Sequence, residues 1–593
     1  MERLFDLEPQ SASTGPVECL GITFPSDKER REYFLEKLRE KLNDPEFRKI
    51  EGLPIGSDED ILALSDPPYY TACPNPFITD FFRHYGVAHE TPTYFRLPFC
   101  GEMKSSTRHP VYSFHPYHTK VPPEVIRSLI EHYTEPGDIV FDGFCGTGMT
   151  GVAARECGRH AILGDLCPIA TFISSVNNMS HDWRLALVEL ERIITESEER
   201  FGYLYRTREA GRVLAVNYFV WSDVFTCPEC VFEFPFFPHG VIHSGNKVET
   251  RRWFPCPSCG AELNIRRVER VIVHEGKKKQ LVWVNAGSGR TRVNRPPTER
   301  DLALLAEIES LTIPTWYPAD RLNPDGYSAK LAQLGDKAIT DVSRFLSTRN
   351  LIVFSDLWSR LSSIEDNAIR NLCKATLTSV FTVISERQGY FGGGGGMSGN
   401  LYMPVVRMEK NIYDSLRRKL SKLEVAEKNK EGHLGVSATT TQSLTTMAVV
   451  PDASVDYIYT DPPFGANIIY SEMNLILEGW LRVRTNDSSE AVIDPTRNRA
   501  FDDYATLMKR CFRECYRVLR PGRWMTVEFH NTMASVWNLI QTAIGESGFV
   551  VAQVDVFDKG STTILADIRP GAAKLDLVIS AYKPNHGLED RFK

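Results

Sequence analysis

The chain has 593 residues, more than the roughly 250–300 at which one hydrophobic core usually divides, so we expect two to four structural units. Hydrophobic residues make up 42% and charged residues 24%, which excludes a fibrous or largely disordered chain. The formal net charge of -7 argues against a polybasic protein that coats nucleic acid. No apolar stretch reaches the ~18 residues of a membrane span, so we expect a cytoplasmic protein.

Residues 1–110 form an amino-terminal extension whose role the sequence does not reveal. This extension contains Asp66-Pro67-Pro68-Tyr69, and the same Asp-Pro-Pro-aromatic pattern returns at Asp461-Pro462-Pro463-Phe464. Two prolines after an aspartate favour a tight turn, so either segment could be a turn and nothing more. The surroundings of each segment must therefore decide its role.

Residues 138–165 predict a β-α-β unit. A short apolar strand covers Asp138 to Phe141, a helix covers about Met149 to Glu156, and a second strand ends at Gly164-Asp165. This order places a glycine-rich turn between a strand and the amino end of a helix. Such a turn is where Rossmann-like proteins bind nucleotides.

The glycine turn and the acid after the second strand predict a nucleoside-cofactor site. Gly146 and Gly148 permit a tight turn and close approach of the backbone to a ligand, and the helix directs free N–H groups towards it. Asp165 lies where an acidic side chain can accept both hydroxyls of a ribose. An unrelated nucleotide-binding Rossmann unit is the alternative.

The stretch HPYHTKVPPEVIRSLIEHYTEPGDIVFDGFCGTGMTGVAA, residues 115–154, resembles the opening of the DNA amino-methyltransferase family. Members of this family methylate adenine N6 or cytosine N4 with S-adenosylmethionine. The resemblance implies that residues 111–185 form the cofactor half of a methyltransferase core, in which a Lys-x-Pro segment and an Asp-Pro-Phe-x-Gly-x-Gly-Thr loop hold the cofactor. The matching residues are Tyr117, Lys120, Pro122, Asp142, Phe144, Gly146, Gly148 and Thr150, while Gly143 replaces the family's proline and Met149 its Ser or Thr.

Residues 186–300 predict an inserted zinc ribbon. Roughly 270 residues separate Asp165 from the next expected core strand, near 436–446, far more than a sheet connection needs. Cys227, Cys230, Cys256 and Cys259 form two Cys-x-x-Cys pairs, and two such knuckles give tetrahedral thiolate ligation of structural zinc. A redox dithiol would explain one pair but not both.

The same region is basic. Between residues 251 and 300, twelve basic residues stand against four acids, which predicts contacts with DNA phosphates. A solvated face of a β-hairpin is the alternative. The twelve are Arg251, Arg252, Arg266, Arg267, Arg270, Lys277, Lys278, Lys279, Arg290, Arg292, Arg295 and Arg300.

Residues 301–435 predict a helical insertion that could take part in target recognition. Helical runs occupy 301–385, and a charged surface helix ends near Gly432. Five glycines, Gly392 to Gly396, predict a mobile linker, with a loop that orders on DNA or cofactor as the alternative.

Residues 436–593 predict the second half of the methyltransferase core. An apolar strand at 455–460 runs into Asp461, as the family's fourth strand runs into its catalytic loop. The segment RVLRPGR, residues 517–523, resembles the segment that follows that loop in the family. With a helix near 533–546 and two last strands, the chain completes an α/β, class I Rossmann-like methyltransferase fold with a seven-stranded sheet.

The resemblance implies a catalytic role for Asp461, Pro462, Pro463 and Phe464. Asp461 and the carbonyl of Pro462 can accept the two N–H groups of the target amine, and the two prolines stiffen the loop. Phe464 is expected to stack on a base flipped out of the duplex. In the other segment, at 66–69, only about 50 residues separate Tyr69 from Lys120, too few for a permuted core. We therefore interpret this segment as a turn; packing near the substrate is its alternative.

We hypothesise that the chain is a site-specific DNA methyltransferase that acts on adenine N6 of double-stranded DNA, with S-adenosylmethionine as cofactor. Asp461 favours adenine because Ser-Pro-Pro is the commoner loop for cytosine in this family. DNA cytosine N4 methylation, RNA amino-methylation and a non-catalytic DNA-binding module are the alternatives. The resemblance suggests restriction-modification or phage defence, with defence-system proteins as partners and, in a prokaryote, a place at the nucleoid.

Overall fold

The computed structural model describes residues 15–87, 94–101, 103, 108–244, 247–273, 276–331, 341–391, 399–466, 468–529, 534–557 and 576–585. It divides into two compact units. The core unit comprises residues 1–185, 366–375 and 422–593, and the inserted unit comprises residues 186–365 and 376–421. Residues on both sides of the expected boundary at 300–301 belong to the inserted unit.

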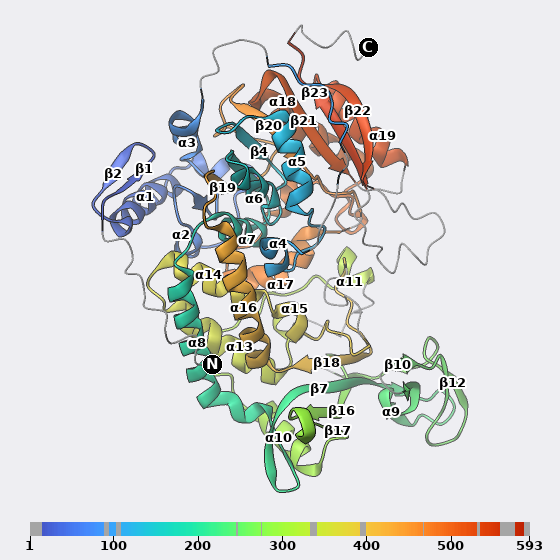
Figure 1. Ribbon diagram of the computed structural model, residues 1–593. Helices are drawn as coiled ribbons and strands as arrows, with labels where there is room; N and C mark the ends of the chain where they lie inside the picture. The colour runs from blue at the N-terminus through green and yellow to red at the C-terminus, as the bar shows by residue number, and fades with distance from the viewer. Residues whose placement is uncertain are drawn as a thin grey trace. The chain divides into compact units, whose positions relative to one another are not determined.

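The core unit contains an eight-stranded sheet (Figure 1). All neighbouring strands are parallel except β23, which runs antiparallel to both β21 and β22. The order is β22 (Val550–Phe557), β23 (Asp576–Tyr582), β21 (Leu519–Phe529), β20 (Val455–Thr460), β4 (Ile139–Asp142), β5 (His160–Asp165), β19 (Ser437–Thr441) and β3 (Tyr70–Thr71). The expected count of seven strands was one too low, because the two residues of β3 come from the amino-terminal extension and pair with β19.

Helices cover both faces of this sheet. On one face, side chains of the strands join a buried cluster with three helices, α3 (Ile78–Tyr85), α18 (Phe501–Val518) and α19 (Ala534–Glu546). On the other face, Tyr133 of α5 (Pro123–Tyr133) stacks on Tyr457 of β20 at 5.1 Å. The remaining core-unit helices are α1 (Asp27–Leu42), α2 (Asp58–Leu64), α4 (Pro110–Phe114), α6 (Met149–Glu156), α7 (Pro168–Asn178) and α17 (Tyr470–Leu481).

Two distant parts of the chain meet in the middle of the sheet, where β20 pairs with β4. Next to this pairing, the carboxylate of Asp456 accepts a hydrogen bond from the Ile139 N–H at 2.9 Å. The same carboxylate accepts one from Arg520 at 2.6 Å, so an ion pair reinforces the backbone ladder. Pro521 and Gly522 of the RVLRPGR segment lie inside β21, where Gly522 has a φ of 80° and the register with β20 shifts.

The segment Asp66-Pro67-Pro68-Tyr69 precedes β3 and therefore lies at the amino edge of the sheet. Arg30 of α1 donates to the carbonyl of Pro67 at 2.8 Å and to the carboxylate of Asp66 at 3.3 Å. Arg31 approaches the same carboxylate to 3.5 Å. Only 3% of the Asp66 side chain and 6% of the Arg30 side chain is exposed, so this segment forms a buried ion-paired turn.

The inserted unit is built on a second sheet, of seven strands, in which the long strand β7 (Arg212–Thr226) pairs antiparallel with five others. The other strands are β6 (Arg206–Glu209), β8 (Glu233–Pro235), β13 (Glu269–Arg270), β16 (Lys279–Ala286), β17 (Val293–Arg295) and β18 (Val406–Lys410). Its helices include α10 (Glu299–Ser310) and α13 (Thr348–Ser362). Three further helices, α8 (Trp183–Phe201), α14 (Asn367–Thr378) and α16 (Ile412–Lys430), run across the limits of the two units, and α16 is the charged helix expected before Gly432.

The run Gly392 to Gly396 lies outside the described residues. Among the helices that are described, none combines the length and the apolar character that a membrane crossing requires.

We predict that Asp66→Asn lowers the free energy of unfolding by about 2 kcal/mol, because Arg30 and Arg31 lose their shared buried carboxylate and keep only the more exposed Asp27 and Asp366. Urea unfolding of the intact chain measures the change. Asp80→Asn is the matched control, since Asp80 pairs with Arg83 on the exposed surface of α3 and its loss should cost within about 1 kcal/mol. Equal stability of the two variants would contradict a structural role for the buried pair.

Candidate active site

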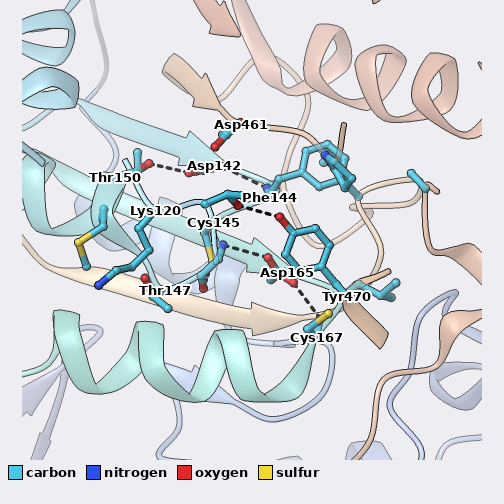
Figure 2. Close-up of a pocket in the computed structure, with 18 of the residues that line it drawn as sticks. Lys120, Asp142, Phe144, Cys145, Thr147, Thr150, Asp165, Cys167, Asp461 and Tyr470 are labelled. Carbon is cyan, nitrogen blue, oxygen red and sulfur yellow. Dashed lines mark hydrogen bonds between the residues drawn. The ribbon is translucent and has the colours of Figure 1, made fainter. Parts of the chain in front are cut away.

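A cavity opens at the carboxyl edge of the core sheet. Three aspartates line it, each placed where a central strand ends: Asp142 at the end of β4, Asp165 at the end of β5 and Asp461 directly after β20 (Figure 2). The cavity measures about 940 Å³, counting the space at its open mouth.

The glycine turn after β4 forms the floor of the cavity. Gly146 and Gly148 have φ angles of 50° and 76°, which favour glycine. At Gly148, which is the N-cap of α6, a Cβ atom would lie 2.3 Å from the Ser174 Oγ, so a larger residue would collide with α7. Gly146 lines the cavity, whereas Gly148 is not among the lining residues and shapes the turn from behind.

Asp165 ties this turn to the segment after β5. Its carboxylate accepts hydrogen bonds from the N–H groups of Gly146 and Cys167, both at 2.9 Å. Asp142 accepts from the Thr150 hydroxyl at 2.5 Å and from the Phe144 N–H at 3.1 Å. The carboxylates are thereby held in fixed orientations at the cavity wall.

Burial changes the ionisation of both carboxyl groups. It raises the pKa of Asp142 to about 7 and the pKa of Asp165 to about 6, although the hydrogen bonds that both accept oppose the shift. A ligand that brings N–H or O–H donors or positive charge would favour the ionised carboxylates. Such perturbed acids in a cavity are typical of a binding site.

Two tyrosines form an aromatic part of the wall. The rings of Tyr117 and Tyr470 are nearly parallel, with centroids 6.4 Å apart. Asn474 donates to the Tyr117 hydroxyl at 3.0 Å, and Thr119 and Tyr470 share a hydrogen bond of 2.7 Å. Tyr117 was predicted from the sequence, whereas Tyr470 was not. The sequence feature that could have indicated Tyr470 is an aromatic residue soon after the Asp461 loop.

Lys120 lines the cavity, but its ammonium group is engaged with the backbone. It donates to the carbonyl of His115 at 2.8 Å and also to the carbonyl of Tyr112. Lys120 therefore holds the segment that carries Tyr117. Phe144 lines the cavity as well, as its place in the glycine-rich motif predicts.

Two buried hydroxyl groups at the cavity form no hydrogen bond with a described residue. Within the described part of the chain, the hydroxyls of Thr147 and Ser489 have no hydrogen-bond partner, and both residues line the cavity. Buried hydroxyl groups are rarely left unpaired, so these positions indicate polar groups of a ligand. Thr147 stands between the two glycines of the turn, where sequence analysis could have found it.

The loop after β20 places Asp461 and Pro463 at the cavity. Tyr504 donates its hydroxyl to the carbonyl of Pro463 at 2.8 Å, which fixes the loop. Pro462 is not a lining residue, and none of the described residues donates a hydrogen bond to its carbonyl. Phe464 is 9% exposed and packs edge-on against Phe529 at 5.3 Å, so its stacking on a target base stays a prediction.

The two Asp-Pro-Pro segments differ in what they hold. At Asp66, the carboxylate and the Pro67 carbonyl both accept hydrogen bonds from the Arg30 guanidinium, which occupies the place that a target amine would need. At Asp461, the segment borders a cavity instead. The alternative that the first segment packs near the substrate finds no support, because none of its four residues lines this cavity.

The inserted unit brings together the four predicted metal ligands Cys227, Cys230, Cys256 and Cys259, with their sulfur atoms within 4.8 Å of one another. The Cys227–Cys259 and Cys230–Cys256 sulfur pairs are 3.9 and 3.7 Å apart. Zinc–sulfur bonds of about 2.3 Å in a tetrahedron require sulfur separations of about 3.8 Å, so the cluster has the dimensions of a zinc site. The N–H of Ser258 points at the sulfur of Cys256 at 3.4 Å, as in a knuckle that holds a thiolate.

Comparison with known proteins places part of the core unit in a family. Residues 34–169 match the model of a family described as DNA methylase (N6_N4_Mtase). This match includes the Asp66 segment and the cofactor half as far as residue 169, and it ends before Asp461. A Type II methyltransferase of Methanocaldococcus jannaschii, M.MjaII, is 29% identical over 117 residues, which is 20% of this chain and 20% of that protein.

Similar solved structures are also methyltransferases. TTHA0409 of Thermus thermophilus, described as a candidate DNA modification methylase, is 18% identical over 23% of this chain and 48% of its own, with a TM-score of 0.15. A 16S rRNA (adenine(1408)-N(1))-methyltransferase from Catenulisporales acidiphilia is 10% identical over 29% of this chain and 72% of its own, with a TM-score of 0.17. These scores are too low to carry an argument. The assignment depends on the family model and on the curated relative, which support the DNA amino-methyltransferase family for residues 34–169.

Proposed function

We propose that the chain transfers a methyl group from S-adenosylmethionine to the exocyclic N6 of adenine in double-stranded DNA. The observation that carries this proposal is the meeting of Asp142, Asp165 and the Asp461-Pro-Pro segment in one cavity. Since the chain spans about a fifth of the length of its curated relative, activity and substrate are proposals from the site. A role in restriction-modification or phage defence stays a prediction.

The cavity fits the chemistry of S-adenosylmethionine. The cofactor carries a positively charged sulfonium and an ammonium, which would favour the ionised forms of Asp142 and Asp165. Its ribose and amino-acid groups supply hydrogen-bond donors and acceptors for Asp165 and for the unpaired hydroxyl of Thr147. Gly146 allows the backbone to approach the ligand, and the Tyr117 ring offers an apolar surface. When bound, the cofactor supplies an electrophilic methyl group.

The Asp461 segment would activate the target nitrogen. The amino nitrogen of adenine is a weak nucleophile because its lone pair is delocalised into the ring. Asp461 accepts one N–H of the amine, and the Pro462 carbonyl is available for the other. Holding both N–H groups draws the nitrogen towards tetrahedral geometry, so that its lone pair can attack the methyl carbon in line. As the new N–C bond forms, the bond between the methyl carbon and the sulfonium sulfur would break, leaving S-adenosylhomocysteine. The nitrogen would pass one proton to the Asp461 carboxylate that accepts its N–H, and no covalent bond to the protein is required.

We predict that Asp461→Ala lowers methyl transfer to DNA by about 1,000-fold or more, because a preorganised partner of the reacting amine is lost. Cofactor affinity should stay nearly intact, since Asp165 and the glycine turn hold that ligand. A radioactive methyl-transfer assay and calorimetric titration of S-adenosylmethionine measure the two effects. The titration also tests the non-catalytic alternative, which expects no cofactor binding by the wild-type protein.

Asp66→Asn is the control, because it removes the carboxylate of the aspartate in the other Asp-Pro-Pro segment. At a temperature where the variant is folded, its turnover should be nearly unchanged. A large catalytic loss there, or substantial turnover by Asp461→Ala, would move the active site away from Asp461. Transfer to total RNA but not to duplex DNA would replace DNA by RNA as the substrate.

We propose structural zinc at the four-cysteine cluster and predict about one zinc ion per chain. Cys227→Ser or Cys256→Ser should release it and destabilise the ribbon, because thiolate ligation replaces a hydrophobic core in a small module. Metal analysis of purified protein measures the content, with Cys100→Ser, an exposed cysteine of the core unit, as the control. Intact protein without zinc would exclude the assignment.

The target atom is predicted to be adenine N6. Methylated DNA is digested to nucleosides and analysed by mass spectrometry, and N6-methyladenine is the expected product. N4-methylcytosine in its place would show that Asp461 serves a cytosine pocket, and the fold and the in-line mechanism would stand.

A further inference from the structure

The inserted unit carries a small hairpin next to the four-cysteine cluster. Strand β11 (Trp253–Pro255) pairs antiparallel with β12 (Glu262–Asn264), and the Cys256–Cys259 knuckle joins them. Trp253 pairs with Asn264, and the N–H of Ile265 donates to the carbonyl of Arg252 at 3.2 Å. The hairpin therefore gathers residues 251–252 and 266–267 at the end that lies away from the knuckle.

Ion pairs neutralise several of the twelve basic residues of this region. Arg270 pairs with Asp223, Lys278 with Glu233, Lys279 with Glu386, and Arg295 with both Glu209 and Asp301. These residues therefore contribute little net positive charge to the surface. The exposed positive charge of this region is therefore much less widespread than the number of basic residues in its sequence suggests.

Four arginines at the end of the hairpin are different. Arg251, Arg252, Arg266 and Arg267 are all exposed, and none forms a salt bridge with a described residue. Within residues 251–270 the only acids are Glu262 and Glu269. Uncompensated positive charge is thus concentrated at one end of the ribbon, on a protein whose overall charge is -7.

An exposed tryptophan lies among these arginines. Side chains alternate along a strand, and the neighbouring Phe254 is 2% exposed, in a buried cluster with Phe234 and Cys256. Trp253 therefore turns outwards, and it is 46% exposed. Nearly half of this large apolar side chain is thus in contact with water, on a hairpin that also carries the four arginines. The same pairing of cationic and aromatic side chains is typical of surfaces that bind nucleic acid.

We propose that Arg251, Arg252, Trp253, Arg266 and Arg267, here called the arginine–tryptophan patch, bind DNA. The arginines contact phosphates, and Trp253 stacks on the face of an unstacked base. The proposal rests on the proposed function, because it names the surface that holds the DNA substrate. Charge complementarity selects this partner, since DNA presents a dense row of phosphates to a patch with no acid among its five residues.

The test measures binding of the full-length, zinc-loaded protein to a fluorescent DNA duplex with an unpaired base, at several salt concentrations. The double variant Arg251→Ala/Arg252→Ala should bind at least about 10-fold more weakly and flatten the slope of log affinity against log salt by about 1.8, for two lost phosphate contacts. Arg251→Lys/Arg252→Lys should keep the slope. Zinc content equal to that of the wild type verifies that each variant is folded.

Trp253→Ala should weaken binding by about 5-fold or more while leaving the salt slope unchanged, because stacking on a base involves no counterion release. Trp253→Phe should retain most of the affinity. The matched control Arg212→Ala/Arg300→Ala removes two exposed arginines elsewhere in the inserted unit and should change neither affinity nor slope by as much.

The outcomes separate this inference from the proposed function. Wild-type protein that binds DNA, with the patch variants equal to it, would overturn the patch and leave the proposed function standing. Wild-type protein that binds no DNA would contradict the proposed function itself. Variants that lose affinity for an RNA oligonucleotide of the same sequence, but not for DNA, would also overturn the proposal, because the patch would then serve RNA.

Discussion

The pairing of β20 with β4 is the contact on which the candidate active site depends. It joins the cofactor half of the core to the catalytic half through two backbone-paired positions, Tyr457 with Val140 and Ile458 with Phe141. Because these strands and β5 are parallel, their carboxyl ends lie at one edge, and Asp142, Asp165 and Asp461 meet there. The buried carboxylate of Asp456 supports the junction by accepting the Ile139 N–H. Without this pairing, no cavity would contain all three acids.

Local sequence predicted some elements to the residue and others within one residue, since the strand expected at Asp138 to Phe141 is Ile139–Asp142. The helix Met149–Glu156 and the strand Val455–Thr460 agree with expectation, since a glycine turn and a short run of apolar and β-rich residues mark their limits. Strand β3 was missed because two residues, Tyr70 and Thr71, carry no periodicity and are recruited only by the edge of β19. Ser489 reaches the cavity from the segment after α17, for which local pattern gives no guide.

The two Asp-Pro-Pro segments show that a short motif indicates a function only together with the elements that surround it. Both contain an acceptor carboxylate followed by a proline carbonyl. Asp66 precedes a strand and is buried against Arg30, whereas Asp461 follows a strand and borders the cavity. Sequence could indicate the difference only through the strand at 455–460 and through the short distance from Tyr69 to the cofactor loop. The sequence could not show that the Arg30 guanidinium donates to both acceptors of the first segment, the Asp66 carboxylate and the Pro67 carbonyl.

The number of basic residues in a region likewise does not give the positive charge on its surface. Twelve basic residues in one region suggested a broad basic surface, but acids from other parts of the inserted unit, such as Asp223 and Glu386, neutralise several of them. Those partners lie far away in the sequence, so local composition could not reveal them. The positive charge that stays exposed belongs to four arginines at the end of a short hairpin, which brings them together. They are Arg251, Arg252, Arg266 and Arg267.

The separation of β4 from β20 along the chain has a consequence for synthesis on the ribosome. The hydrogen bond between Ile139 and Asp456 spans 317 positions, and at about 5–20 residues per second the ribosome needs roughly 15–60 s to deliver the second partner. During that time the edge of β4 is an unpaired strand, open to wrong partners. The inserted unit, with a sheet of its own, is synthesised almost entirely within this interval. Its length therefore sets how long the nascent core must wait with an open edge.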